Sequence, residues 1–243
     1  MNTVVIIPSR YGSTRFAGKP LALICDKPMI QMVYESAIKA ERITGVWVAT
    51  DDDRIRKAVE NFGGKVVMTS EDNRSGSDRV AEAAKKLGLD SNDIVVNVQG
   101  DQPLLDYRCL DDVVAPFFEE NKPEMTTLSY KITDPSEISN PKDVKVVSDL
   151  AGNALYFSRS PIPCERDAGS NFDTYKHLGV YAYTRDFLEL FNELPSGKLE
   201  QIEKLEQLRA IEHGYKIRVI VSEFDSPEVD LPEDIQRIEQ KLK

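Results

Sequence analysis

The feature that most constrains the fold is an alternation of short apolar runs with longer amphipathic stretches in the N-terminal part of the chain. Runs typical of strands alternate with stretches of helical spacing in the order Val4–Ile7, Met29–Ala40, Gly45–Ala49, Asp52–Phe62, Gly64–Met68, Ser77–Leu87 and Ile94–Val98. Ile94–Val98 has almost no polar residue, as expected of a strand that is covered on both faces. This βαβ alternation predicts an α/β fold with a mostly parallel sheet flanked by helices.

The pattern changes after Phe118. Strand-like runs with polar connections, typical of antiparallel structure, follow at Met125–Ile132, Val144–Val147 and Ala154–Phe157. After them we expect a helix at Leu199–His213, a strand at Lys216–Val221 and a last helix at Pro232–Leu242. Gly214 is a candidate C-cap. Because no clear linker interrupts the chain, we expect one domain over residues 1–243. Its main part covers about 1–120, a smaller antiparallel part about 121–215, and residues 216–243 return to the main sheet.

Charge and cysteine content exclude several classes of protein. The chain has 41 acidic and 31 basic residues, a net charge of −10, so it repels nucleic acid and anionic membranes, and we expect neither as a partner. Any anionic substrate must therefore meet a local cluster of positive groups or a metal ion. Cys25, Cys109 and Cys164 lie far apart without CxxC spacing, which suggests neither a disulfide framework nor a zinc site. Met1–Pro8 lacks the pattern of a signal peptide, so we expect a cytoplasmic protein.

A glycine-containing cationic loop, Pro8–Pro20, follows the first expected strand directly. It combines Gly12 and Gly18 with Arg10, Arg15 and Lys19 at the end of a strand, where open α/β sheets bind ligands. Five residues separate the glycines and proline follows the lysine, so this is not a Walker A loop, and the GxGxxG fingerprint is absent. The loop therefore predicts a phosphate site of another type, with a solvated basic turn as the alternative.

Asp101 and Asp230 are candidate ligands of a hard cation. Asp101 follows the buried run Ile94–Val98 and Gly100, and Asp230 lies between the last expected strand and the last helix. Mg²⁺ takes one or two protein carboxylates together with phosphate oxygens and water. The alternatives are a turn-forming Asp101 and an Asp230 that caps the last helix.

The loop Ile7–Leu21 resembles the signature loop of sugar nucleotidyltransferases and, more narrowly, that of the 3-deoxy-manno-octulosonate (KDO) cytidylyltransferase family. The resemblance spans nearly the whole chain and includes Ala49–Asp52, Ser75–Arg79, Val96–Leu104, Ala154–Arg159, Lys176–Tyr183, Leu205–Arg209 and Val229–Asp234. It implies the reaction CTP + KDO-type sugar acid → CMP-sugar acid + diphosphate, for lipopolysaccharide synthesis. It also implies the Rossmann-like nucleotidyltransferase fold, with a nucleotide-binding main part, a smaller antiparallel sugar-binding and dimerisation part, and a homodimer.

The same resemblance assigns roles to individual residues. Catalysis would rest on Asp101, Asp230, Arg10 and Lys19, with Mg²⁺ held by the two aspartates. CTP would be bound by Pro8, Arg10, Gly12, Ser13, Arg15, Lys19, Ser75, Gly76, Arg79, Gln99 and Asp101. The sugar acid would be bound by Gln99, Arg159, His177, Tyr181, Glu206 and Gln207.

The residues themselves leave simpler interpretations open for several of these positions. Ser75 or Ser77 is equally explained as the N-cap of a helix. His177 and Tyr181 lie four residues apart, so in a strand they share one face, where a structural histidine is the ordinary case. Glu206 and Gln207 belong to a very charged stretch and fit a solvated helix face. No general base is evident.

The chain departs from the common family pattern at Gln102, where glutamate is usual, and at Phe224–Glu228. Both features resemble a branch that acts on the 8-amino-3,8-dideoxy derivative of KDO, and the added acidity suits an amine. The open alternatives are a cytidylyltransferase for another 2-keto sugar acid, such as sialic acid, and a non-catalytic nucleotide-sugar binding protein.

Overall fold

The computed structural model describes residues 1–12, 16–167, 169 and 172–242. One large mixed sheet has the strand order β11-β7-β10-β6-β1-β4-β5. Strands β1 (Thr3–Ser9), β4 (Gly45–Thr50), β5 (Val66–Met68) and β6 (Ile94–Asn97) are mutually parallel. Strand β10 (Tyr175–Thr184) runs antiparallel to β6 and to β7 (Met125–Lys131), and β11 (Arg218–Ser222) pairs with β7 in parallel. The predicted α/β class, with a mostly parallel sheet flanked by helices, is confirmed.

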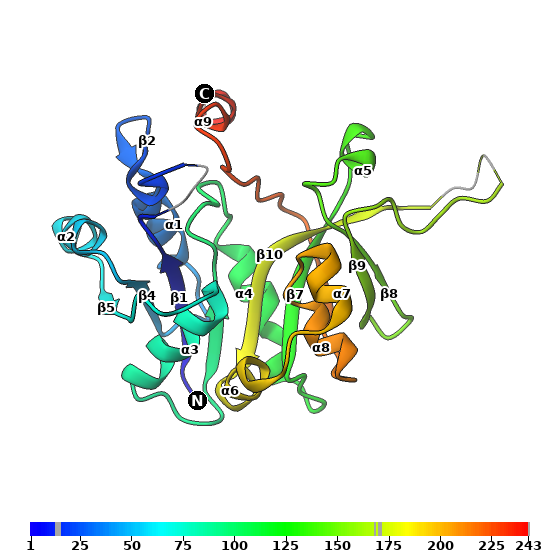
Figure 1. The fold of residues 1–243 in the computed structure, drawn as a ribbon, viewed down its shortest axis with the longest axis horizontal. Helices are drawn as coiled ribbons and strands as arrows, with labels where there is room; N and C mark the ends of the chain where they lie inside the picture. The colour runs from blue at the N-terminus through cyan, green and yellow to red at the C-terminus, as the bar shows by residue number, and fades with distance from the viewer. Residues whose placement is uncertain (13–15, 168, 170–171, 243) are drawn as a thin grey trace.

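A small antiparallel extension projects from the main sheet beyond β10. It is formed by β8 (Lys145–Ser148) and β9 (Ala154–Ser158), which pair with each other, and β8 also pairs with β10. In Figure 1 this hairpin lies on the far side of β7 from the parallel strands. A separate short hairpin joins β2 (Leu23–Ile24) and β3 (Lys27–Pro28).

Helices cover both faces of the sheet. The α-helices are α1 (Met29–Ala37), α2 (Asp53–Asn61), α3 (Gly76–Lys86), α4 (Arg108–Val114), α5 (Ser136–Ser139), α6 (Arg185–Glu193), α7 (Lys198–Glu203), α8 (Leu208–Glu212) and α9 (Asp234–Lys241). Two short 3₁₀ segments are η1 (Lys19–Leu21) and η2 (Ala115–Phe118). Among the described residues no helix is long and apolar enough to cross a bilayer.

The alternation of side chains along β1 divides the core into two layers. Val5 and Ile7 pack with α1, α2 and α4 on one face, whereas Val4 and Ile6 pack with α3, α6 and α8 on the other. Successive strand side chains point to opposite faces, so an apolar residue at every position of β1 requires cover on both sides. The continuous apolar run is therefore the reason why helices lie on both faces.

Local sequence signals define several helix ends. Asp52 accepts a hydrogen bond from the Arg54 N–H and caps α2. The predicted C-cap at Gly214 is confirmed: its φ is 83°, and the Tyr215 N–H reaches back to the Ala210 carbonyl at 2.9 Å.

The single helix predicted over Leu199–His213 is wrong. The chain forms α7 and α8 instead, and Lys204, which ends α7, has a φ of 55° in the left-handed region. Hydrogen bonds that the spacing cannot reveal hold the break, because the Glu203 carboxylate accepts from Ser158 Oγ at 2.7 Å and from the Arg159 N–H at 3.0 Å. Helices α4 and α6 were not predicted, although both bury an apolar stripe.

Candidate active site

The predicted cationic loop and Asp101 lie where β1 and β6 end. From β1 the chain moves outward to β4 and β5, and it then returns to form β6 on the other side of β1. The connections that leave β1 and β6 therefore diverge, and in open α/β sheets ligands bind at such a point. The cationic loop follows β1 and Asp101 follows β6. Of the predicted loop residues, Ser13 and Arg15 lie outside the described part of the chain.

The second glycine of the loop makes a turn that other residues accommodate poorly. Gly18 has a φ of 72°, and its N–H donates to the Tyr11 carbonyl at 2.9 Å. A Cβ at Gly18 would stand 3.1 Å from the Tyr11 ring. At Gly12, by contrast, the space that a Cβ would fill is open.

Arg10 connects the loop to the start of α3. Its guanidinium donates to the Ser75 carbonyl at 2.8 Å and to the Arg74 carbonyl at 3.3 Å. Burial lowers the pKa of Arg10 below its ordinary value, and the nearby charge of Arg79 acts in the same direction. Arg10 thus holds two predicted CTP-binding segments together.

The start of α3 is a capping box. Ser75 Oγ accepts from the Asp78 N–H at 3.1 Å, and the Asp78 carboxylate accepts from the Ser75 N–H at 3.1 Å. The N-cap interpretation is therefore confirmed for Ser75. A Cβ at Gly76 would stand 3.6 Å from Pro8 and 4.0 Å from Gln99, so α3 begins against both of these predicted site residues.

Arg79 lies beneath this surface and has no exposed area. Its guanidinium donates to Asp51 at 2.6 Å and to Thr69 Oγ1 at 2.5 Å. These bonds make Arg79 a buried support for the start of α3, and its contact with CTP stays a prediction.

Lys19 and Asp101 meet at the centre of the site. Lys19 Nζ lies 2.6 Å from Asp101 Oδ2 and donates to the Val229 carbonyl at 3.0 Å. The Val229 N–H donates in turn to the Asp101 carbonyl at 2.9 Å. This bond holds the backbone that leads into Asp230 against the backbone of Asp101. Figure 1 shows the segment that leads from β11 to α9 passing on the side where β1 and β6 end.

Asp230 is not the cap of the last helix. Helix α9 begins after Glu233, and Asp234 in its first turn accepts the N–H groups of Asp230 and Leu231, each at 2.9 Å. The side chain of Asp234 therefore makes the local bonds that the capping alternative had given to Asp230.

The donor set at this point suits a divalent cation. Asp101 Oδ1 is buried and has no hydrogen-bond partner, although its other oxygen is paired with Lys19. The protein around Glu228 desolvates its carboxyl and raises its pKa to about 7, and the charges of Asp101 and Asp230 act in the same direction. No group of three or more His, Cys, Asp or Glu within the described residues has the arrangement of a complete metal site. The two aspartates would thus leave coordination positions for phosphate oxygens and water, as Mg²⁺ prefers.

His177 and Tyr181 lie on one face of β10, as predicted, with ring centroids 5.2 Å apart. His177 Nε2 is 2.9 Å from Thr127 Oγ1, and that hydroxyl donates its hydrogen to the Val180 carbonyl at 2.7 Å. Nε2 must therefore carry the hydrogen of the neutral ring. Desolvation lowers the pKa of His177 to about 3, so the imidazole is neutral near pH 7.

The break between α7 and α8 turns Glu206 and Gln207 inward. Glu206 accepts from Ser77 Oγ at 2.7 Å, and burial raises its pKa above the ordinary value. Gln207 is 4% exposed, and its Nε2 has no hydrogen-bond partner. The solvated-face interpretation is therefore wrong for both residues, because the chain leaves the helix before it reaches them.

Arg159, at the end of β9, is held by a residue that the sequence did not single out. Its Nε donates to the Glu203 carbonyl at 2.7 Å, and its terminal nitrogens donate to the carbonyls of Pro141 and Lys204 at 2.9 and 3.4 Å. Glu203 lies in the charged stretch 198–206, and nothing in its spacing marks it as the residue that orients Arg159.

Gly179 in β10 lies between the predicted CTP-binding and sugar-binding residues. A Cβ there would stand 3.4 Å from Glu228 Oε1, 3.6 Å from Gln99 Cγ and 3.8 Å from Gln102 Nε2. Gln102 Nε2 in turn donates to Glu228 Oε1 at 3.4 Å. Gln102 and Glu228, noted in the sequence only as departures from the family pattern, thus lie among the predicted site residues.

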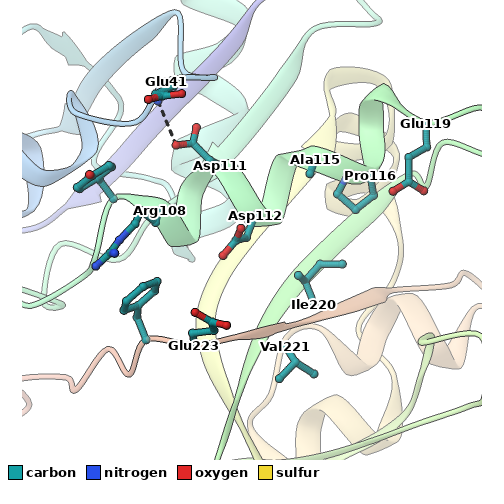
Figure 2. Close-up of a pocket in the computed structure, with 12 residues that line it drawn as sticks. Glu41, Arg108, Asp111, Asp112, Ala115, Pro116, Glu119, Ile220, Val221 and Glu223 are labelled. Atoms are coloured by element: carbon teal, nitrogen blue, oxygen red, sulfur yellow. Dashed lines mark hydrogen bonds between the residues drawn. The ribbon is translucent and has the colours of Figure 1, made fainter.

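Another hollow lies away from these residues and suits a triphosphate poorly. It has a volume of about 800 Å³ between α4 and β11. Figure 2 shows the carboxylates of Glu41, Asp111, Asp112, Glu119 and Glu223 around it. Its arginine, Arg108, is paired with Asp106 and stacks 3.8 Å from the Phe224 ring centroid. Such a negative lining repels an anionic ligand.

Comparisons with known proteins identify the relatives of this chain. The family model described as cytidylyltransferase matches residues 4–217. The chain is 63% identical to 3-deoxy-manno-octulosonate cytidylyltransferase of Desulfatibacillum aliphaticivorans, over 100% of this chain and 99% of that protein. It is 57% identical to 8-amino-3,8-dideoxy-manno-octulosonate cytidylyltransferase of Shewanella sediminis (strain HAW-EB3), with the same coverage.

A solved structure gives the same result for the fold. The structure of CMP:2-keto-3-deoxy-manno-octonic acid synthetase complexed with CTP matches with a TM-score of 0.93 and 41% identity. The match covers 100% of this chain and 98% of the other.

Proposed function

This chain belongs to the cytidylyltransferase family, and we propose from that premise that it activates a KDO-type sugar acid with CTP. In this reaction the anomeric hydroxyl attacks the α-phosphorus of CTP, the CMP-sugar acid forms, and diphosphate leaves. The observation that carries the proposal is the meeting of Lys19, Asp101 and the Val229–Asp230 segment at the point where β1 and β6 diverge.

The cationic loop and the start of α3 bind the nucleotide. Lys19 brings a positive charge to the phosphates of CTP, and Gly12 leaves open space beside the loop backbone. Arg10 fixes the loop against Ser75 and Gly76, so the N–H groups at the start of α3 are held in place for the nucleoside. Most of the catalysis comes from such positioning and from charge neutralisation.

Asp101 and Asp230 would hold Mg²⁺. The ion, when bound, lowers the pKa of the attacking hydroxyl and neutralises phosphate charge. Asp101 offers the unpartnered Oδ1 for this purpose, and Lys19 stays paired with its Oδ2.

The sugar acid is bound between β10 and the α7–α8 break. Arg159 pairs with its carboxylate, a role for which a guanidinium already oriented by Glu203 is well suited. Gln207 Nε2 offers a donor to a hydroxyl, and Glu206 offers an acceptor. His177 does not act as a base, because its pKa is about 3. Its ring packs against the ring of Tyr181 and orients it.

The cellular setting belongs to the same proposal. We infer a cytoplasmic enzyme that supplies an activated sugar for lipopolysaccharide assembly, as the sequence resemblance implies. We also infer a homodimer, because Leu150 and Leu155 on the β8–β9 hairpin and Ile202 on α7 expose apolar side chains. Sedimentation analysis tests the dimer, and a monomer at micromolar concentration would contradict it.

Diphosphate release tests the activity. The purified protein is incubated with CTP, MgCl₂ and, separately, KDO, its 8-amino-3,8-dideoxy derivative and sialic acid. We expect release with at least one octulosonate. Release with sialic acid alone would replace the substrate class, and CTP binding without release from any acid would favour the non-catalytic binding protein.

A further inference from the structure

Glu228 brings another carboxylate to the border between the two aspartates and β10. Its Oε1 lies 3.4 Å from the place where a Cβ of Gly179 would stand and 3.4 Å from Gln102 Nε2. Gln102 is completely buried, whereas Glu228 keeps exposed surface as a residue, although the protein around its carboxyl desolvates that group. Gln102 therefore holds the carboxylate from the protein side.

Among the described residues, Gln102 Nε2 is the hydrogen-bond donor that reaches the Glu228 carboxylate. Lys19, the nearby cation, already donates to Asp101 and to a backbone carbonyl. With Mg²⁺ on the two aspartates, as proposed above, the Glu228 carboxylate still offers acceptor positions to a ligand group. A hydroxyl can donate one hydrogen there, whereas an ammonium donates three and forms charge-assisted bonds.

The two candidate sugar acids differ in the charge that they bring. A hydroxylated sugar acid brings a net charge of about −1 at neutral pH, because its carboxyl is ionised. The corresponding amino sugar acid is a zwitterion, since a primary amine is protonated at that pH. The amine thus brings a positive charge that the hydroxyl analogue lacks.

Resting on the cytidylyltransferase activity proposed above, we propose that Glu228 is the residue that selects an amine-bearing octulosonate over its hydroxyl analogue. Glu228 contacts the substrate ammonium, and Gln102 is a positioning residue that orients the carboxylate. Relatives named for each of the two substrates match at 63% and 57% identity, so overall similarity does not decide between them.

The test compares kcat/KM for KDO and for 8-amino-3,8-dideoxy-KDO in the intact protein and in Glu228→Gln. The unaltered protein should prefer the amine by about ten- to hundredfold, the range expected of one hydrogen bond to a charged group. In Glu228→Gln the value for the amine should fall by that factor, mainly through KM, while the value for KDO changes by less than about twofold.

Further variants separate recognition from general damage. Glu228→Gly, which removes the side chain, should abolish the preference in the same way, and thermal unfolding shows whether each variant is folded. Glu223→Gln, an exposed carboxylate of the hollow in Figure 2, is the matched control and should keep the preference. Gln102→Met should raise KM for the amine at nearly constant kcat. The preference should also weaken as KCl is increased.

The outcomes distinguish the inference from the function on which it rests. Turnover of KDO with no preference for the amine, or equal losses for both acids in Glu228→Gln, overturns the role of Glu228 and leaves the cytidylyltransferase in place. Absence of diphosphate release with either acid overturns both.

Discussion

Lys19 Nζ donates to Asp101 Oδ2 at 2.6 Å across 82 positions of sequence, and this contact joins the two halves of the nucleotide site. One partner comes from the loop after β1 and the other from the end of β6. Both are largely covered, with 15% and 24% of their side chains exposed, so the pair is screened less than a surface ion pair. The lysine positions one carboxylate oxygen and leaves Asp101 Oδ1 available.

Asp101→Asn should reduce turnover by at least about a hundredfold while the protein stays folded, because loss of a metal-binding carboxylate removes several kcal/mol of charge stabilisation. Diphosphate release at increasing MgCl₂ measures the effect. Asp186→Asn, an exposed carboxylate on α6, is the control. Near-normal turnover at ordinary MgCl₂ would remove Asp101 from the metal site.

Glu203→Gln should raise KM for the sugar acid about tenfold, because the Arg159 backbone N–H and Ser158 Oγ lose the charged acceptor that fixes the end of β9. KM for CTP should change little, since Glu203 contacts only the sugar side. Steady-state kinetics with each substrate varied separately measure the two constants. Glu189→Gln, in an exposed pair with Arg185, is the control; an equal rise in both KM values contradicts the assignment.

His177 should make the protein less stable in mild acid. Desolvation lowers its pKa to about 3 in the folded state, against about 6.5 in the unfolded chain. Between these values the unfolded state binds more protons, so the free energy of unfolding falls as the pH drops below about 6.5.

Between pH 7 and pH 5 the unaltered protein should lose up to about 2 kcal/mol of its free energy of unfolding through His177, and His177→Gln should not show this loss. Urea unfolding at several pH values measures the difference. Imidazole proton signals provide an independent observation, and a His177 ring that titrates near pH 6.5 in the folded protein contradicts the prediction.

Arg79→Met should destabilise the fold by about 3 kcal/mol, because it leaves the Asp51 carboxylate and Thr69 without their buried donor. Arg56→Met, which breaks only solvent-exposed pairs with Asp53 and Glu60, should change stability little. Urea unfolding of the two variants gives the comparison. Similar losses for both would mean that the buried pair adds nothing to stability.

Gly18→Ala should cost about 1 kcal/mol for its positive φ and should also raise KM for CTP, because the new Cβ meets the Tyr11 ring at 3.1 Å. Gly63→Ala is matched in backbone conformation, with a φ of 78°, but its Cβ meets nothing within 4 Å. It should lose similar stability without a change in KM. Equal KM values in the two variants would exclude a role for the Gly18 turn in CTP binding.

The sequence by itself determined the elements whose signals are local. Val4–Ile7 and Ile94–Val98 indicated strands covered on both faces, and the structure places them side by side as β1 and β6. Asp52 and Gly214 marked helix ends through bonds to neighbours a few residues away. Such signals depend on the period of the chain and on the nearest backbone groups, so they can be read without knowing the fold.

Only the tertiary structure decided how the site is assembled. The meeting of Lys19 with Asp101, the inward turn of Glu206 after Lys204, the support of Arg159 by Glu203 and the contact of Gln102 with Glu228 all join residues on different elements. Their hydrogen bonds form only after strands distant in sequence have paired. The helical pattern over 199–213 carries no information about the hydrogen bonds that the end of β9 makes to the Glu203 carboxylate. The physical reason is that local periodicity records which face of an element is buried, whereas the partner of a polar side chain is set by long-range packing.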